Sequence, residues 1–216
     1  MRYKLVIFDF DGTIADTSDG IIDSHNYALQ QMGRETPAME ELYGLIGGNL
    51  LDIYIKHFGF SETDAREAVK IYRQRYAKVG IHKAHLYPGF KDLLVALKKA
   101  GVNVGIATLK AEVFATLMVE ELGVSEFFDC ICGMDNHDGL TKVDLIRKCM
   151  NEIGCNLGET VLIGDTVGDC KGAESAGVEF IGITYGFGFS KEKPYKFQCC
   201  DTCDELKNII LEIRKS

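Results

Sequence analysis

Two aspartates, Asp9 and Asp11, stand two residues apart in the stretch VIFDFDGTIADT, directly after a run of apolar residues. Such a run is typical of a buried strand, where one carboxylate is costly to bury and a second beside it costs more. Residues i and i+2 of an extended segment face the same way, so both carboxylates can enter one pocket. The pair therefore needs either a compensating cation or an opening to solvent.

A second acidic pair stands in VLIGDTVGD, where Asp165 follows another apolar run and Asp169 comes one helical turn later. In open α/β sheets, ligands bind beyond the carboxyl ends of the strands. If the two strands are neighbours, four carboxylates converge at one sheet edge, and their repulsion calls for a cation. Because hard oxygen ligands favour Mg²⁺, the sequence predicts a magnesium site there.

Two further residues could bind an anion near these carboxylates. Thr108 ends the apolar stretch GIATLK, and a predicted helix follows, so its hydroxyl and the first helical N–H groups could cradle a phosphate. Lys142 falls in the first turn of another predicted helix, where its charge opposes the helix dipole and is therefore expected to serve elsewhere. The alternatives are a helix N-cap for Thr108, which could serve both purposes, and a solvated surface lysine for Lys142.

Five short apolar stretches, several of them rich in β-branched residues, indicate buried parallel strands. They are Tyr3–Phe8, Val102–Ala107, Phe128–Cys132, Thr160–Ile163 and Val178–Ile183. Amphipathic helical patterns separate the last four, and another is predicted in the C-terminal DELKNIILEIRKS. Strands that alternate with helices indicate an α/β fold with a doubly wound, Rossmann-like parallel sheet.

The long segment between the first two strands has a different pattern. No strand is predicted from about Ala15 to Ala84, and about seventy residues is far longer than an ordinary connection. The helical segments expected there are Ile21–Met32, Met39–Leu45, Leu50–Phe58 and Glu62–Val79. We therefore predict a catalytic core of residues 1–14 and 86–216, with residues 15–85 inserted as an all-helical cap domain.

Composition and charge limit the partners of the chain. Its 24 basic and 32 acidic residues give a net charge of −8, which argues against bulk attraction to a nucleic-acid polymer or an acidic membrane. The N-terminal apolar run, Leu5–Phe8, is too short for a signal-peptide core, and no uncharged apolar run approaches membrane-spanning length. We expect a cytoplasmic monomer or homodimer.

Eight cysteines are expected to be free thiols, since no export signal is seen. The stretch CCDTC, with Cys199, Cys200 and Cys203, could suggest a zinc knuckle. It lacks a second ligand pair at a suitable spacing and has no histidine close in sequence, which argues against zinc. The role of these three residues is left open.

Together, the acidic pairs, the threonine and the lysine resemble the four motifs of the haloacid dehalogenase-like superfamily of phosphotransferases, over essentially the full chain. The matching residues are DFDGT (Asp9–Thr13), Thr108, Lys142 and GDTVGD (Gly164–Asp169). The inserted helical stretch is similar to the cap of the subclass whose cap follows the first motif. The resemblance therefore implies the α/β core and helical cap already expected from the pattern of elements.

The resemblance also implies a role for each catalytic residue. Asp9 would be the nucleophile that forms an aspartyl-phosphate, and Asp11 would protonate the leaving alkoxide and then activate water. Thr108 and Lys142 would bind the transferring phosphoryl oxygens, and Lys142 would also offset the charge on Asp9.

A Mg²⁺ ion is the cofactor that the resemblance implies. Its ligands would be Asp9, the backbone carbonyl of Asp11 and Asp165. Asp169 would be a further ligand or would support the others.

Two positions depart from the family pattern. Asparagine commonly follows the threonine of motif two, and here it is Leu109; proline commonly follows the lysine of motif three, and here it is Val143. Lys110 and Lys148 are alternatives for the lysine role. Neither departure removes a required group.

The acid Asp11 favours phosphate-ester chemistry, because the dehalogenase and phosphonatase branches lack an aspartate at this position. The segments Leu45–Tyr54 and Gly182–Gly188 resemble features of the phosphoglycolate phosphatase-like branch, although Gly47–Gly48 could simply break a helix. We expect a phosphatase of small phosphorylated metabolites: phosphoglycolate-like compounds, nucleotides or sugar phosphates. The alternatives are a β-phosphoglucomutase-like phosphosugar mutase and, more distantly, a non-catalytic binding module.

Overall fold

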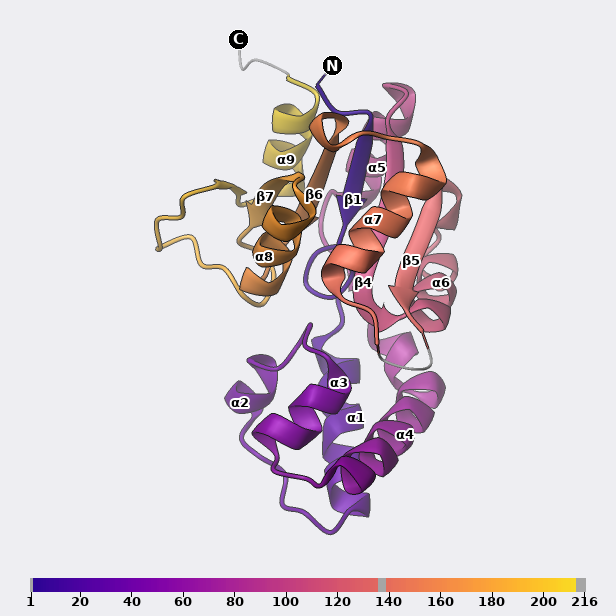
Figure 1. The fold of residues 1–216 in the computed structure, drawn as a ribbon, viewed down its shortest axis with the longest axis vertical. Coiled ribbons are helices and arrows are strands. Elements are labelled where there is room, and N and C mark those ends of the chain that lie inside the picture. The colour runs from indigo at the N-terminus through magenta and orange to yellow at the C-terminus, as the bar shows by residue number, and fades with distance from the viewer. Residues whose placement is uncertain (1, 136–138, 213–216) are drawn as a thin grey trace.

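A six-stranded parallel sheet forms the centre of the molecule, in a computed structural model that describes residues 2–135 and 139–212 (Figure 1). Its strands are β1 (Leu5–Phe8), β4 (Asn103–Ala111), β5 (Cys130–Met134), β6 (Thr160–Gly164), β7 (Glu179–Ile183) and β8 (Gln198–Cys200). They are arranged in the order β5-β4-β1-β6-β7-β8, so β1 lies between β4 and β6. The predicted doubly wound α/β sheet is confirmed, and the two strands that carry the acidic motifs are neighbours.

Helices cover both faces of this sheet. They are α5 (Phe90–Lys99), α6 (Glu112–Glu121), α7 (Lys142–Ile153), α8 (Val167–Ala176) and α9 (Cys203–Ile210). Val6 and Phe8 of β1 pack into the core beneath α5, α6 and α9, whereas Leu5 and Ile7 pack into the core beneath α7 and α8. Because both faces are buried, the strand is apolar throughout and shows no alternation.

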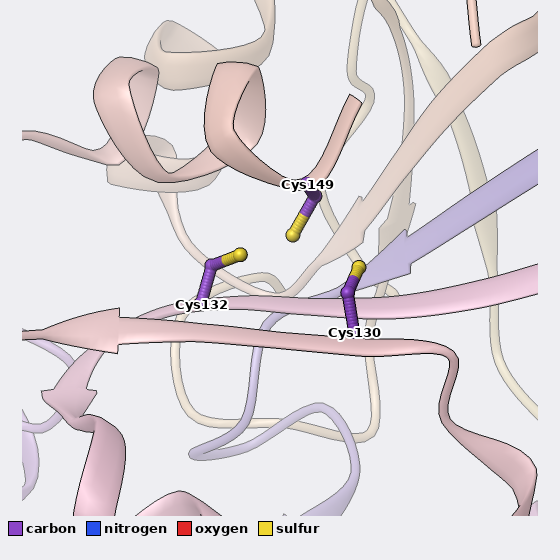
Figure 2. A group of neighbouring side chains, drawn as sticks. All are labelled: Cys130, Cys132 and Cys149. Atoms are coloured by element: carbon purple, nitrogen blue, oxygen red, sulfur yellow. The ribbon is translucent and has the colours of Figure 1, made fainter. Parts of the chain in front are cut away.

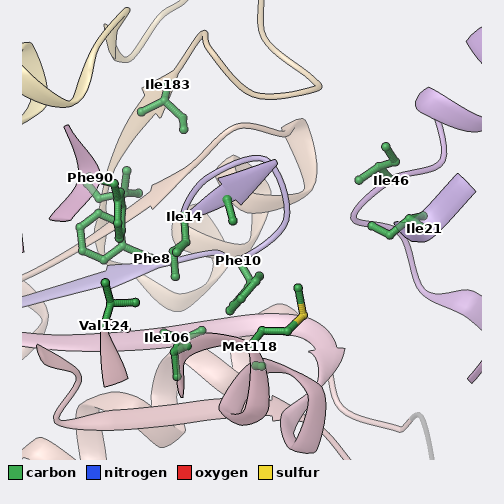
Figure 3. Packing of buried hydrophobic residues seen from close by; sticks show 14 of the residues in the cluster. Phe8, Phe10, Ile14, Ile21, Ile46, Phe90, Ile106, Met118, Val124 and Ile183 are labelled. Atoms are coloured by element: carbon green, nitrogen blue, oxygen red, sulfur yellow. The ribbon is translucent and has the colours of Figure 1, made fainter. Parts of the chain in front are cut away.

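The packing beneath α5 is aromatic and continues toward the inserted helices. Phe8 meets Phe90 of α5 edge to face, with ring centroids 5.2 Å apart (Figure 3). Ile21 and Ile46 of the inserted segment belong to the same buried cluster. This continuity holds the inserted helices against the carboxyl end of the sheet.

The inserted segment is almost entirely helical. Its elements are α1 (Ser18–Gln31), α2 (Met39–Tyr43), α3 (Leu50–Asp52) continued by a π-helical turn (Ile53–His57), α4 (Glu62–Lys78) and a 3-10 turn (Gly80–Lys83). Figure 1 places α1 to α4 together below the sheet. Each of the four predicted helical segments therefore contains a helix; the third includes the π-helical turn. That they form a separate cap domain stays a prediction.

Three strand predictions were wrong in detail. A two-residue strand, β2 (Ala15–Asp16), pairs antiparallel with β3 (His85–Leu86), where no strand was expected before Ala84. The edge strand β8 was missed because it is only three residues long and lies at the polar edge of the sheet. Strand β4 runs on to Ala111 instead of ending at Ala107.

Among the described residues, no helix has both the length and the apolar character needed to cross a bilayer.

Candidate active site

Three of the predicted carboxylates meet at the carboxyl end of the central strands. Asp9 follows β1, Asp165 follows β6, and Asp169 is the third residue of α8. One oxygen atom from each lies within 4.8 Å of the others, and all three residues are buried. The registry of β1 with β6, Phe8 opposite Ile163, brings the two strand ends level. Three acidic side chains thus form one group of hard oxygen donors.

Lys142 lies inside this acidic group. Its Nζ atom is 2.6 Å from Asp9 Oδ1, 2.7 Å from Asp169 Oδ1 and 2.8 Å from the carbonyl oxygen of Ala107. Burial alone would lower the pKa of Lys142, but the carboxylates of Asp169 and Asp9 outweigh it and hold the pKa above its usual value. The side chain is therefore a buried ammonium, and the surface-lysine alternative is wrong.

One ammonium does not neutralise the three carboxylates. Burial raises the pKa of Asp9 to about 6, against the opposing attraction of Lys142, and the charge of Asp169 raises it further. Burial also raises the pKa of Asp165 to about 7, helped by repulsion from Asp9 and Asp169. Carboxylates whose charged form is destabilised in this way fit a divalent cation, since hard oxygen donors are what such an ion prefers.

Asp165 is held by two hydrogen bonds that sequence reasoning did not identify. Thr13 Oγ1 donates to its Oδ1 at 3.0 Å, and the backbone N–H of Phe187 donates to its Oδ2 at 2.7 Å. A Cβ atom on Gly186 would lie 2.3 Å from the carbonyl oxygen of Gly12 and 2.4 Å from Asp165 Cβ. Only glycine therefore lets the loop after β7 approach closely enough to make the second bond.

Asp11 points to different partners. Its Oδ1 accepts hydrogen bonds from Thr17 Oγ1 and Lys110 Nζ, both at 2.7 Å. Lys110 also donates to the hydroxyl of Tyr76 in α4 at 2.8 Å. The side chains of Asp11 and Lys110 are only 8% and 5% exposed, so this is a buried ion pair. Through the hydrogen bond of Lys110 to Tyr76, this pair connects the carboxyl end of the sheet to the inserted helices.

Each of the two alternative lysines has an acidic partner other than Asp9. Lys110 pairs with Asp11, and Lys148 pairs with Glu112 at 2.9 Å on the surface. The sequence did carry a signal for Lys110, since a strand that continues past Thr108 sends residues two apart to the same side. That signal was hidden by the expectation that the strand ends at Ala107.

Thr108 is buried within β4 and is not a helix cap. Helix α6 begins only at Glu112, with Ala111 in the capping position, so both the N-cap and the helix-start cradle at Thr108 are wrong. The threonine hydroxyl instead accepts a hydrogen bond from the backbone N–H of Lys110 at 3.2 Å. The reason is that β4 continues through these residues, which sequence periodicity alone did not show.

A pocket opens between the sheet and the inserted helices. Asp11, Thr108 and Lys110 line it from the sheet side. The inserted helices contribute a mixture of polar groups and glycines: His25, Asn49, Arg73, Gly47 and Gly48. Gly47 has a φ angle of +83°, so it does break the helical path, and it lines the pocket as well.

Comparisons with known proteins show the family of the chain. The family model for haloacid dehalogenase-like hydrolases matches residues 6–183. A 5'-nucleotidase from Pseudomonas aeruginosa is 35% identical over 193 residues, covering 89% of this chain and 87% of that protein. A phosphoglycolate phosphatase from Agrobacterium fabrum is 28% identical over 190 residues, covering 85% and 81%. The crystal structure of a predicted phosphatase from Clostridium acetobutylicum superposes with a TM-score of 0.91 at 31% identity, covering 99% and 100% of the two chains.

Proposed function

Because the chain belongs to the haloacid dehalogenase-like hydrolase family and is a phosphoric monoester hydrolase, we propose that it is a Mg²⁺-dependent phosphatase acting through an aspartyl-phosphate on Asp9. The observation that carries the proposal is the contact of Lys142 with both Asp9 and Asp169, inside a group of three buried carboxylates. A phosphate monoester is hydrolysed extremely slowly without catalysis, so a positioned charge array of this kind is what the reaction needs.

The residues divide the reaction between them. Asp9 attacks phosphorus, and Lys142 offsets the negative charge that the incoming phosphoryl group brings to this carboxylate. Thr108 donates its hydroxyl to a phosphoryl oxygen. Asp11 lines the pocket beside Thr108, where it would give a proton to the leaving oxygen and afterwards take one from the attacking water.

Mg²⁺ would supply charge neutralisation at the phosphoryl oxygens, held by Asp9, the backbone carbonyl of Asp11 and Asp165, with Asp169 as a further ligand or a support. Support for Asp169 as a positioning residue comes from its hydrogen bonds. Its Oδ2 accepts from the backbone N–H and the hydroxyl of Thr166, while its Oδ1 faces Lys142.

The substrate is proposed to be a small phosphorylated metabolite: a phosphoglycolate-like compound, a nucleotide or a sugar phosphate. The names of the two relatives, a 5'-nucleotidase and a phosphoglycolate phosphatase, support the first two of these classes. The pocket beside Asp11 supports a leaving group with polar atoms, since Asn49, Arg73 and Lys110 line it. Residues 15–85 would act as the cap that closes this pocket, in a cytoplasmic protein.

The test is a phosphate-release screen over phosphomonoesters and nucleotides, with and without Mg²⁺. We expect release that requires Mg²⁺ and falls at least about 10³-fold in Asp9→Asn, since the nucleophile is removed. Asp92→Asn, which changes an exposed aspartate in α5, is the matched control and should retain activity. No release from any substrate would contradict the proposal. Conversion of a sugar 1-phosphate to its 6-phosphate without net release would favour the mutase.

A further inference from the structure

Three cysteines gather on the face of the sheet covered by α7. They are Cys130 and Cys132 of β5 and Cys149 of α7, and their sulfur atoms all lie within 4.8 Å of one another. Figure 2 shows the three side chains pointing toward a common centre between strand and helix. Each residue is at most 7% exposed. Sulfur atoms from two different elements therefore share one closed space.

Local sequence explains why the three sulfur atoms meet. Cys130 and Cys132 are two residues apart on a strand, so both face α7. Beneath them, Gly105 of β4 leaves room: a Cβ atom there would lie 2.8 Å from Cys130 Sγ and 3.6 Å from Cys149 Sγ. The thiol of Cys149 donates a hydrogen bond to the carbonyl oxygen of Ile106, which is also in β4, at 3.0 Å.

We propose that Cys130, Cys132 and Cys149 form a closed, three-sulfur binding site for Cu(I). A metal–sulfur bond of about 2.3 Å places the sulfur atoms of a trigonal site roughly 4.0 Å apart, which the observed grouping can accommodate. Soft thiolate ligands select soft ions, Cu(I) among them. The proposal concerns a site separate from Asp9 and does not rest on the proposed phosphatase function.

The number of ligands favours Cu(I) over Zn²⁺. Closed structural zinc sites have four protein ligands. Among the residues that the structure describes, the grouped ligand atoms here are three, and the burial of the cluster keeps water from serving as a fourth. A soft ion that accepts three ligands therefore fits better than one that requires a tetrahedron.

Coordination of the ion changes the charge of the site. Each thiol that coordinates releases a proton to solvent, so the occupied site carries a net negative charge. Lys148 acts on Cys132, but it is itself paired with Glu112, whose carboxylate acts on the same sulfur with the opposite sign.

An ion at this position would tie α7 to β5. Cys149 and Lys142 are seven residues apart on α7 and so lie on the same side of the helix, two turns from each other. Because the ion would bind residues of both α7 and β5 only in the folded chain, binding is expected to stabilise the fold and to raise its melting temperature.

The experiment supplies Cu(I) to the full, reduced chain without oxygen, in competition with the chelator bicinchoninate. We expect one Cu(I) per chain, with three sulfur neighbours at about 2.3 Å by X-ray absorption, and a raised melting temperature. Cys132→Ala and Cys149→Ala should each lower the affinity at least about 100-fold, because loss of a ligand costs more than loss of a group that merely orients one. The double variant Cys199→Ala/Cys203→Ala is the matched control and should keep the affinity.

Several results would overturn the proposal. They are no binding by the wild-type chain, an unchanged affinity in Cys132→Ala, a loss confined to the Cys199→Ala/Cys203→Ala control, or fewer than three sulfur neighbours. Tighter binding of Zn²⁺ than of Cu(I) would overturn the assignment of the ion. Circular dichroism checks that each variant folds, and the absorption measurement on the wild-type chain does not depend on any variant.

Discussion

Lys142 carries the positive charge of the acidic site. It contacts Asp9 and Asp169 directly and reaches the carbonyl oxygen of Ala107, so its position is fixed from three sides. A charge held in place before the substrate arrives costs no reorganisation during the reaction. Under the proposed function, this fixed charge is the reason for a lysine at the start of α7, where the helix dipole alone would disfavour it.

Replacing Lys142 should therefore impair catalysis. In Lys142→Met we expect kcat for the best substrate to fall about 10²- to 10³-fold, because one preorganised charge is lost. Lys148→Met on the same helix is the matched control: its exposed partner is Glu112, and its kcat should stay close to that of the wild type. Equal losses in the two variants would argue against a special role for Lys142.

At the scale of elements, the loop after β7 contributes to the site because its backbone comes close to Asp165. The N–H of Phe187 reaches Asp165 only because Gly186 has no side chain between Gly12 and Asp165. A carboxylate that loses such a hydrogen bond is less well oriented toward a metal ion. The loop thus contributes backbone geometry, a contribution that residue types alone do not reveal.

Gly186→Ala is expected to push this loop away from Asp165. The concentration of Mg²⁺ needed for half-maximal activity should rise about 10- to 100-fold, since the support of a ligand is lost. Gly158→Ala, at a position where a Cβ atom meets nothing within 4 Å, should leave it unchanged. An unaltered Mg²⁺ requirement in Gly186→Ala would show that the loop does not orient Asp165.

A buried histidine of α1, His25, packs against α4. His25 lies 3.2 Å from the hydroxyl of Tyr54, and its ring is 4.7 Å from that of Tyr72. Burial lowers the pKa of His25 to about 4, with a smaller effect from His57. In the unfolded chain the same imidazole takes up a proton below about pH 6.5. Its stabilising contribution is therefore complete above about pH 6.5 and is lost as the pH falls toward 4.

His25→Phe should reduce the pH dependence of stability. Between pH 7 and pH 5 the wild-type chain is expected to lose about 2 kcal/mol of unfolding free energy through this residue, and the variant should lack that loss. Urea unfolding at both pH values measures the difference. The same substitution at His85, which is exposed, provides the comparison. Parallel pH profiles for wild type and His25→Phe would refute this account.

At the scale of the whole molecule, the two crossings between the sheet and the inserted helices lie side by side. Ala15 and Asp16 pair with Leu86 and His85 in a ladder only two residues long. A short two-stranded ladder is a weak element, which makes it a suitable place for a hinge. The hydrogen bonds of Lys110 to Asp11 and Tyr76 span the same gap.

Closure of the inserted helices should change the exposure of this hinge. With Mg²⁺ and vanadate as a phosphate analogue, we expect slower amide hydrogen exchange in residues 14–16 and 84–88, because the closed form is more populated. Amides in β6 provide the internal control. Equal exchange at both crossings with and without vanadate would count against a lid.

The sequence by itself determined the fold class and where the two strands that carry the acidic motifs, β1 and β6, leave the core. Apolar runs that stop at Asp9 and Asp165 are legible because a strand buried on both faces must be apolar until it leaves the core. The same logic placed the helical insertion, since its periodicity differs from that of the strands. The missed features are those with weak local patterns: the edge strand β8, the short β2–β3 ladder and the extension of β4.

Only the tertiary structure decided which groups meet. Lys142 and Asp9 are 133 residues apart, and strand order brings them to 2.6 Å. Sequence could not separate Lys142, Lys110 and Lys148, because a lysine's partner depends on how its helix or strand packs. Convergence of Cys130, Cys132 and Cys149 likewise required the packing of α7 on β5. Local sequence sets which helix or strand carries a side chain, whereas the packing of distant elements sets which residues that side chain contacts.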